Sequence, residues 1–387
     1  MTIMIKYISI LIVLAGIGFN SPAQDAYMDA SAAEKEKTYV GADAYPVKTY
    51  PQKFKAQKPK NIILMIGDGM GISQVFAGLT ANHGKLFLEN MKYIGFSKTQ
   101  SASDYITDSA AGGTALSCGV KTYNGAIGVD NDTVTVKTIL EDAEKKGLAS
   151  GLVSTSAITH ATPASFIAHQ PSRNMYEEIA ADFLKTDIDV FIGGGMDHFT
   201  KRKDARNLVE ELRKKDYQVE TDINRIASVK KGKLAGITAD MHNGRMNERG
   251  DMLPVATQTA INILDNNLKG FFLMVEGSQI DWGGHANSTI YIAEDMLDFD
   301  RTIGKALDFA SKDGETLVIV TADHETGGLS ILGGDMNTGI VKGEYSTKDH
   351  SAVMVPVFAY GPGAGNFIGI MENTEIHKKM KKLLIGE

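Results

Sequence analysis

Short apolar runs that alternate with helical segments are the feature that most restricts how this chain can fold. A run of this kind, bounded by turn residues, suits a strand buried on both faces of a parallel sheet. The expected strands cover residues 61–66, 93–98, 150–154, 190–192, 271–275, 317–321 and 355–360. The expected helices cover residues 73–82, 136–146, 174–184 and 288–310. The alternation predicts an α/β fold, a three-layer αβα sandwich with a central, mostly parallel sheet.

The first residues carry the pattern of an export signal. Lys6 precedes an apolar run at 8–19, and small residues lead to a cleavage site after Ala23. The run is too short for a good membrane span. A signal peptide at 1–23 is therefore favoured over a retained anchor. The mature protein would be periplasmic or secreted and would keep no membrane span.

The rest of the chain divides by composition. Residues 24–58 are polar and rich in Lys, Gln, Pro and Ala, which is typical of a loosely held N-terminal arm. Residues 59–387 are expected to form a single domain, with a polar, peripheral elaboration at about 196–258. The net charge is only −7 and no basic stripe is present, so nucleic acid is not an expected partner. Cys118 is the only cysteine, which excludes an internal disulfide, and it is expected in the core.

Acidic residues and histidines follow three of the expected strands. Asp68 comes just after the first strand, Glu276 after the strand at 271–275, and Asp323 with His324 after the strand at 317–321. One such Asp is usually a turn or helix cap. Because ligands bind at the carboxyl ends of strands in parallel sheets, three of them together indicate metal.

Further residues add other ligand types. Asp281 and His285 are four residues apart, so a helical turn would place both on one side, a spacing that suits zinc. His350 precedes the last strand. Thr162 offers a hard oxygen suited to magnesium, and the planar fork of Arg173 can hold a phosphate through two bonds.

Ser109 lies where a loop runs into a helix, in Thr107-Asp108-Ser109-Ala110-Ala111-Gly112-Gly113-Thr114-Ala115. A helix start favours an anion through its unpaired N–H groups and its dipole. Taken alone, a serine there is more often a helix cap. It is a nucleophile only if neighbouring groups, such as a metal ion, remove its proton.

Six motifs, in this order, resemble the alkaline phosphatase family in a compact bacterial form without a large insertion. They are Gly67-Asp68-Gly69-Met70-Gly71, Thr107-Asp108-Ser109-Ala110, His160-Ala161-Thr162-Pro163-Ala164, Glu276-Gly277-Ser278-Gln279-Ile280-Asp281, Thr321-Ala322-Asp323-His324-Glu325 and His350. The resemblance covers about residues 60–370. It implies a homodimeric enzyme with two zinc ions and one magnesium ion per subunit. It also implies hydrolysis of many phosphate monoesters through a phosphoserine, with an alkaline optimum.

The resemblance assigns roles position by position. The metal ligands that it implies are Asp281, His285 and His350 for the first zinc, Asp323, His324 and Asp68 for the second, and Asp68, Thr162 and Glu276 for the magnesium. Ser109 would be the nucleophile and Arg173 the phosphate clamp. Asp108 is expected to orient Arg173 through an ion pair.

Two positions vary within the family. His160 stands where some members carry Asp, and it is expected to reach the magnesium through water and to tilt that site toward zinc. Trp282 stands where some members carry Lys and others His, and it is expected to line the site. Because Trp282 cannot supply a cation, phosphate release and magnesium affinity do not transfer from any one member.

Alternatives remain open. Two other functions fit parts of this pattern. The protein could be another metal-dependent enzyme of the superfamily, such as a phosphodiesterase, or a non-catalytic phosphate-binding protein. The combination of Arg173, Thr162 and Glu276 favours a monoesterase. Four of the remaining histidines lie in polar stretches and are expected to be solvated: His83, His198, His242 and His377. His169 is expected to make a structural hydrogen bond.

Overall fold

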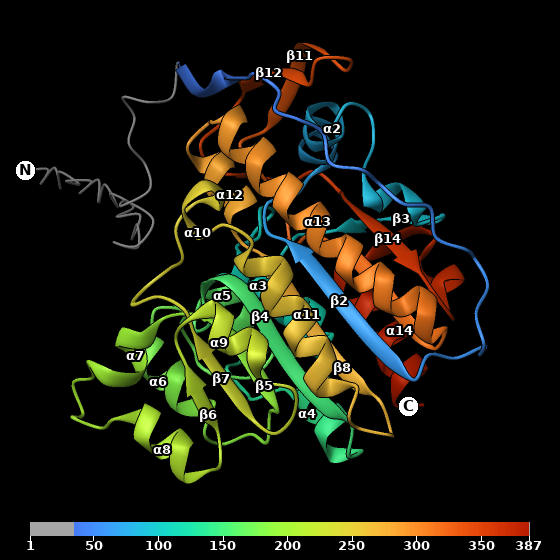
Figure 1. The fold of residues 1–387 in the computed structure, drawn as a ribbon. Coiled ribbons are helices and arrows are strands. Elements are labelled where there is room, and N and C mark those ends of the chain that lie inside the picture. Colours follow the sequence, from blue (N-terminus) through green and yellow to red (C-terminus); the bar gives the residue numbers. More distant parts are fainter. Residues whose placement is uncertain (1–34, 387) are drawn as a thin grey trace, which may run out of the picture.

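A ten-stranded sheet runs through the centre of the computed structural model, which describes residues 35–386 (Figure 1). In order across the sheet, the strands are β15 (Gly369–Glu372), β3 (Tyr93–Lys98), β14 (Val355–Tyr360), β9 (Thr316–Thr321), β2 (Asn61–Gly67), β8 (Phe271–Gly277), β4 (Ala149–Ala157), β5 (Val190–Gly194), β7 (Leu234–Ile237) and β6 (Gln218–Glu220). Of these ten, β14 runs antiparallel to both of its neighbours and the others run parallel to one another. The predicted fold class is confirmed.

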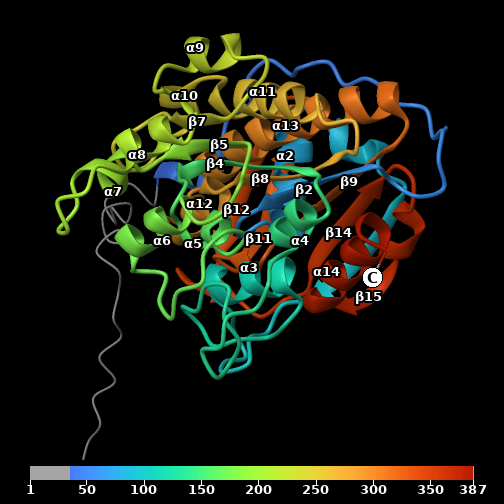
Figure 2. The same cartoon turned by 90° about the horizontal axis from the view of Figure 1, so that it is seen from below.

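Two apolar cores lie on opposite faces of the sheet. Alternate side chains of β2 enter each core, with Ile63 and Met65 in one and Ile62 and Leu64 in the other. One face is covered by α2 (Ile72–Ala81), α9 (Ile223–Ser228), α11 (Met252–Leu264) and α13 (Thr289–Asp313). The other is covered by α3 (Ser109–Cys118), α4 (Ile139–Lys145), α6 (Tyr176–Asp182), α7 (Met196–Thr200), α8 (Leu208–Lys214) and α14 (Asn373–Leu384). Figure 2 shows the sheet between these two layers.

Capping residues set the helix boundaries. Ser288 caps α13 by accepting a hydrogen bond from the Tyr291 N–H, and Gly314 ends the helix in the left-handed conformation. Helix α4 begins three residues later than the sequence suggested. Thr138 and Glu141 form a capping box there, so the residues before Thr138 stay outside the helix.

The N-terminal arm is held more firmly than its composition indicated. Strand β1 (Thr38–Tyr39) pairs with β12 (Ile340–Tyr345), which forms a hairpin with β11 (Leu329–Asp335). Tyr50 is buried, and the Tyr45 hydroxyl donates to Asp300 on α13. The aromatic rings of the arm account for the difference, because they bury against α13. The predicted signal peptide and the first part of the arm lie outside the described residues.

The polar stretch 196–258 is also less peripheral than expected. Its strands β6 and β7 extend the central sheet beyond β5, and α11 begins within it and packs on β4 and β5. The buried face of β7 is short, so the polar residues around it dominate the composition. Its last short helix is α10 (Met246–Arg249).

The remaining elements are short. They are η1 (Lys35–Lys37), η2 (Phe87–Asn90), α5 (Ala161–Ala164), α12 (Gln279–His285), β10 (Glu325–Thr326), β13 (His350–Ser351) and η3 (Ala364–Phe367). Between residues 35 and 386, every helix is too short or too polar to cross a membrane.

The surroundings of four side chains can be compared with the sequence-based predictions. His198 and His377 are buried, not solvated as predicted, because α7 and α14 pack them against the domain. Cys118 is buried as predicted. His169 makes the expected structural contact, with Nδ1 2.7 Å from the Gly128 carbonyl oxygen.

His377 makes the stability of the fold sensitive to acid. Its ring lies against Gly119, the left-handed residue that ends α3. Burial, with Lys381 nearby, lowers the pKa of His377 to about 4, against about 6.5 in an unfolded chain. The unfolded chain therefore takes up this proton first as the pH falls. The stabilisation is complete above pH ~6.5 and is lost between ~6.5 and ~4.

Between pH 7 and pH 4, we expect the free energy of unfolding to fall by up to about 3 kcal/mol less in His377→Gln than in the wild type. Denaturant unfolding at several pH values measures this. His83→Gln, at an exposed histidine, is the matched control. Identical pH profiles for His377→Gln and the wild type would contradict the prediction.

Candidate active site

The carboxyl ends of three adjacent strands bring the predicted ligands together. Strand β2 lies between β8 and β9, and Ile66 pairs with both Glu276 and Thr321. Asp68 follows β2 directly, and Asp323 follows β9. The strand ends that precede Asp68, Glu276 and Asp323 therefore meet at one edge of the sheet.

The first group of candidate ligands contains Asp68, Asp323 and His324. His324 Nε2 lies 3.5 Å from Asp68 Oδ1 and 3.3 Å from Asp323 Oδ2. These two oxygens are buried and have no hydrogen-bond partner among residues 35–386. Buried carboxylate oxygens without donors are costly unless a cation faces them. The group therefore fits a metal ion.

The second group contains Asp281 and His350, whose ligand atoms also lie within 4.8 Å of one of His324, and His285 adjoins them. Nε2 of His285 and Nε2 of His350 lie 3.4 Å and 3.5 Å from Asp281 Oδ1, and 3.2 Å from each other. The Nδ1 atoms face backbone carbonyls, His285 that of Lys348 at 2.6 Å and His350 that of Thr107 at 2.9 Å. If each Nδ1 donates to its carbonyl, each Nε2 is left with a lone pair for a metal.

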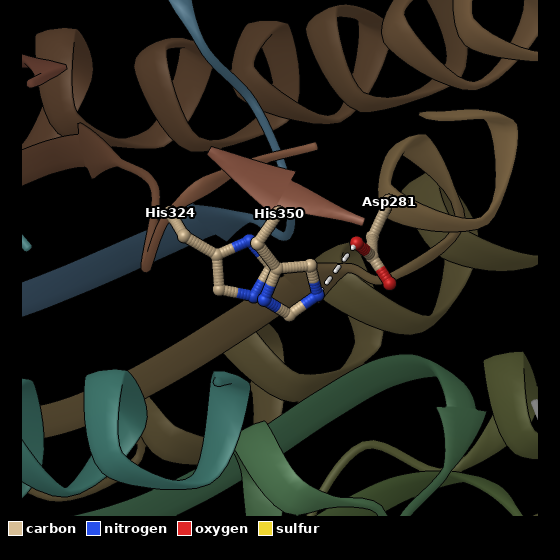
Figure 3. Close-up of side chains that lie close together, drawn as sticks. All are labelled: Asp281, His324 and His350. Atoms are coloured by element: carbon tan, nitrogen blue, oxygen red, sulfur yellow. Dashed lines mark ion pairs between the residues drawn. The ribbon is translucent and has the colours of Figure 1, made fainter. Parts of the chain in front are cut away.

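The two groups adjoin each other. The rings of His324 and His350 stack with centroids 3.5 Å apart. Figure 3 shows both rings beside the Asp281 carboxylate, with the ion pair between His350 and Asp281 dashed. The arrangement places two candidate metal positions side by side.

A third group lies on the other side of Asp68. Ligating atoms of Asp68, His160 and Glu276 lie within 4.8 Å of one another. Thr162 Oγ1 lies 3.5 Å from Asp68 Oδ2. Glu276 Oε2 accepts from Ser154, while Oε1 of Glu276 has no hydrogen-bond partner in the described part of the chain.

Crowding of acids perturbs their protonation. Burial, and then the charge of Asp323, raises the pKa of Asp68 well above its ordinary value. Burial, and then Asp281, raises the pKa of Asp323 to about 8. Burial would also raise the pKa of Asp281, but the His285, His350 and His324 imidazoles lower it. The acids repel one another, and bound cations would remove that penalty.

Ser109 occupies the first turn of α3. Its hydroxyl is buried and lies 3.2 Å from His324 Nε2. The residue that caps α3 is Asp108, whose Oδ1 accepts from the Ala111 N–H at 3.0 Å. The interpretation of Ser109 as the helix cap is therefore wrong, and its hydroxyl faces the candidate metal positions.

Asp108 also holds Arg173. Arg173 Nη1 donates to Asp108 Oδ2 at 2.8 Å, which is the expected ion pair, and Nη2 lies 3.4 Å from His160 Nε2. Burial would raise the pKa of Asp108, but Arg173 lowers it below its ordinary value. The guanidinium is thus fixed beside the start of α3, where both could bind the oxygens of an anion.

A protein-family model for alkaline phosphatase matches residues 59–343. Alkaline phosphatase 3 of Bacillus subtilis (strain 168) is 36% identical, and the match covers 96% of each chain. The alkaline phosphatase of Escherichia coli (strain K12) is 32% identical over 85% of this chain and 87% of its own.

The chain belongs to the alkaline phosphatase family. Among solved structures, the alkaline phosphatase of the Antarctic bacterium TAB5 has a TM-score of 0.81 and 46% identity, over 85% of this chain and 99% of that one. The chain is therefore an enzyme of this family. The family implies phosphate monoester substrates and divalent metal ions, for which the three groups of side chains offer positions.

The alkaline phosphatase site differs in detail from the sequence-based picture. His160 is expected to act through water, and one of its ring nitrogens lies within 4.8 Å of ligand atoms of Asp68 and Glu276. Trp282 is 5% exposed and lies edge-on to His160, with ring centroids 6.2 Å apart. It therefore lies beside the third group and is also buried.

Sequence reasoning missed three kinds of residue around the site. His242 was expected to be solvated, yet its Nδ1 accepts from the Ala157 N–H at 3.0 Å and its ring lies 5.0 Å from that of Trp282. Ser154 and Thr326 contact Glu276 and Asp281. No local pattern identifies these residues, since a lone His, Ser or Thr has many structural uses.

Removal of divalent ions is expected to destabilise this protein. The buried acids would then face one another without compensating charge. We expect a chelator to lower the free energy of unfolding by at least about 3 kcal/mol, as mass action gives for a ligand at a hundred times its Kd. Calorimetry with and without chelator measures this. Asp323→Asn, which removes one of the acids, should show a smaller difference. An unchanged melting temperature would exclude a structural contribution from metal.

Proposed function

We propose that this enzyme hydrolyses phosphate monoesters through a covalent phosphoserine on Ser109, with two Zn²⁺ ions and one Mg²⁺ ion per subunit. The family and the fold support phosphomonoester hydrolysis. The observation that carries the finer proposal is the position of the Ser109 hydroxyl, 3.2 Å from His324 Nε2, beside two groups of ligands.

The donor sets suggest which ions bind where. The first and second groups combine carboxylates with imidazole nitrogens, which suits zinc. Their residues are Asp68, Asp323 and His324 in the first and Asp281, His285 and His350 in the second. Asp68, Thr162 and Glu276 offer oxygens, which suit magnesium. His160 beside them could favour zinc instead. Bound ions of this kind would lower the pKa of the serine hydroxyl and stabilise charge on the attacking and leaving oxygens.

The protein groups then carry the reaction in two steps. The Ser109 oxygen bonds to phosphorus as the bond to the alcohol oxygen breaks, and the alcohol leaves with a proton. A water then attacks the phosphoserine, releases inorganic phosphate and restores the Ser109 hydroxyl. Arg173 and the first N–H groups of α3 would hold the other phosphoryl oxygens in both steps.

Cellular context forms part of the same proposal. The signal pattern at 1–23 supports a periplasmic or secreted enzyme, and the family resemblance supports a homodimer. The site would hold mainly the phosphoryl group, which supports a broad substrate range. The need for neutral imidazoles at the metal positions supports an alkaline optimum.

Replacement of Ser109 should abolish turnover. We expect Ser109→Ala to lower kcat for p-nitrophenyl phosphate by about a thousandfold or more, because no oxygen is left to accept the phosphoryl group. Acid quenching followed by mass spectrometry should find phosphate on Ser109 in the wild type only. Ser117→Ala, a buried serine on the same helix, is the control and should keep turnover.

Three outcomes would contradict this proposal. Normal turnover by Ser109→Ala would exclude the covalent route. Faster turnover of bis(p-nitrophenyl) phosphate than of the monoester would favour the phosphodiesterase alternative. Absence of any turnover after zinc and magnesium addition would favour a phosphate-binding protein.

The Asp108–Arg173 ion pair should control phosphate affinity. Asn can still cap α3, so Asp108→Asn removes the charge that orients Arg173 and keeps the helix start. We expect KM for the monoester and the inhibition constant of inorganic phosphate to rise about tenfold, equal to about 1.4 kcal/mol. Inhibition kinetics measure both constants. Unchanged phosphate affinity would show that Arg173 does not depend on this ion pair.

A further inference from the structure

A buried hydroxyl connects the first and second ligand groups. Thr326 lies in β10 and is fully buried. Its Oγ1 lies 2.5 Å from Asp281 Oδ1, to which it donates, and 3.2 Å from His324 Nδ1. By their contacts, Asp281 lies with His285 and His350, and His324 lies with Asp68 and Asp323. Ligand atoms of Asp281 and His324 also lie within 4.8 Å of each other. Thr326 is not among the metal ligands that the family resemblance implies.

The direction of these hydrogen bonds follows from counting protons. Asp281 faces the Nε2 atoms of His285 and His350, and as a carboxylate it can only accept. Thr326 has one hydroxyl proton, which it donates in the hydrogen bond to the Asp281 carboxylate. The remaining contact therefore requires the Thr326 oxygen to accept from an Nδ1–H of His324.

This direction fixes the tautomer of His324. With the proton on Nδ1, the lone pair is on Nε2. Nε2 is the atom that faces Ser109 Oγ at 3.2 Å, Asp323 Oδ2 at 3.3 Å and Asp68 Oδ1 at 3.5 Å. An imidazole that ligates a metal through one nitrogen usually donates from the other, which sets the orientation of its ring.

The surrounding backbone leaves Thr326 little freedom. A Cβ on Gly69 would lie 2.8 Å from Thr326 Oγ1, and one on Gly284 would lie 2.8 Å from its Cβ. Its backbone pairs with His350 in the β10–β13 ladder. The neighbouring Glu325 anchors the ladder by accepting from Gln74 Nε2 at 2.7 Å and from the Ser351 hydroxyl.

We propose that Thr326 is a positioning residue that couples the two zinc sites, by accepting from His324 Nδ1–H and donating to Asp281. Through this chain, one hydroxyl orients a ligand of each site. The inference rests on the proposed function, because it assumes that these two groups bind zinc. It adds a residue that acts through the ligands and does not touch the metal or substrate.

Three variants of the full-length protein distinguish the effect of the Thr326 hydroxyl from the effect of side-chain size. Thr326→Val keeps the size of the side chain and removes the hydroxyl. Thr326→Ser keeps the hydroxyl. Thr259→Val is the control, at a buried threonine on α11 whose hydroxyl donates to the Val255 carbonyl. Zinc affinity is measured by competition with a chromogenic chelator, independently of turnover.

We expect Thr326→Val to lose about 10- to 100-fold in zinc affinity. Thr326→Ser should stay close to the wild type, and Thr259→Val should equal it. Wild-type zinc affinity in Thr326→Val would overturn the proposal. Equal losses in Thr326→Ser and Thr326→Val would also overturn it, because the methyl group rather than the hydroxyl would then matter.

A second measurement needs no variant that must fold. In zinc-loaded wild-type protein labelled with ¹⁵N-histidine, proton–nitrogen correlations report which ring nitrogen carries hydrogen. We expect Nδ1 of His324 to carry it, and a proton on Nε2 would overturn the proposal. Failure of the proposed function would look different, because the wild type would bind zinc with this tautomer yet not hydrolyse monoesters.

Discussion

Repulsion among four buried carboxylates is the constraint on which the rest of the structure depends. Parallel strands end at the same edge of a sheet, so Asp68, Glu276 and Asp323 cannot spread apart without breaking the strand pairing. Asp281 joins them from α12. Burial removes the solvent that would screen their charges. Arg173 offsets part of this charge. Oxygens of Asp68, Asp323 and Glu276 that have no hydrogen-bond partner among residues 35–386 are left for cations.

Short elements outside the sheet complete the site, and close backbone approach makes them rigid. Strands β10 and β13 are only two residues long. Their pairing nevertheless brings the ring of His350 against the ring of His324. Gly69 and Gly284 allow β10 to pack against the β2 turn and α12, where a Cβ would meet Thr326. Ligand geometry is therefore set by backbone contacts as much as by side chains, as preorganised metal sites require.

At the start of α3, the single residue Asp108 has two structural roles. Asp108 caps the helix and pairs with Arg173, so the guanidinium and the helix N–H groups converge on the same volume. Because the cap is Asp108, the next hydroxyl, Ser109, is free to face His324. Either residue type can cap a helix, and their neighbours in space decide which one does.

The sequence alone determined the fold class and the set of candidate ligands, because strand patterns are local and because acids at the ends of parallel strands must converge. It also determined most strand positions, including Tyr93–Lys98. Only the tertiary structure decided which residue caps α3, that the arm and residues 196–258 join the packed domain, and that His242 and Thr326 border the site. These features depend on contacts between residues far apart in the chain. The burial and hydrogen bonds of a polar residue are set by such contacts and not by its neighbours in sequence.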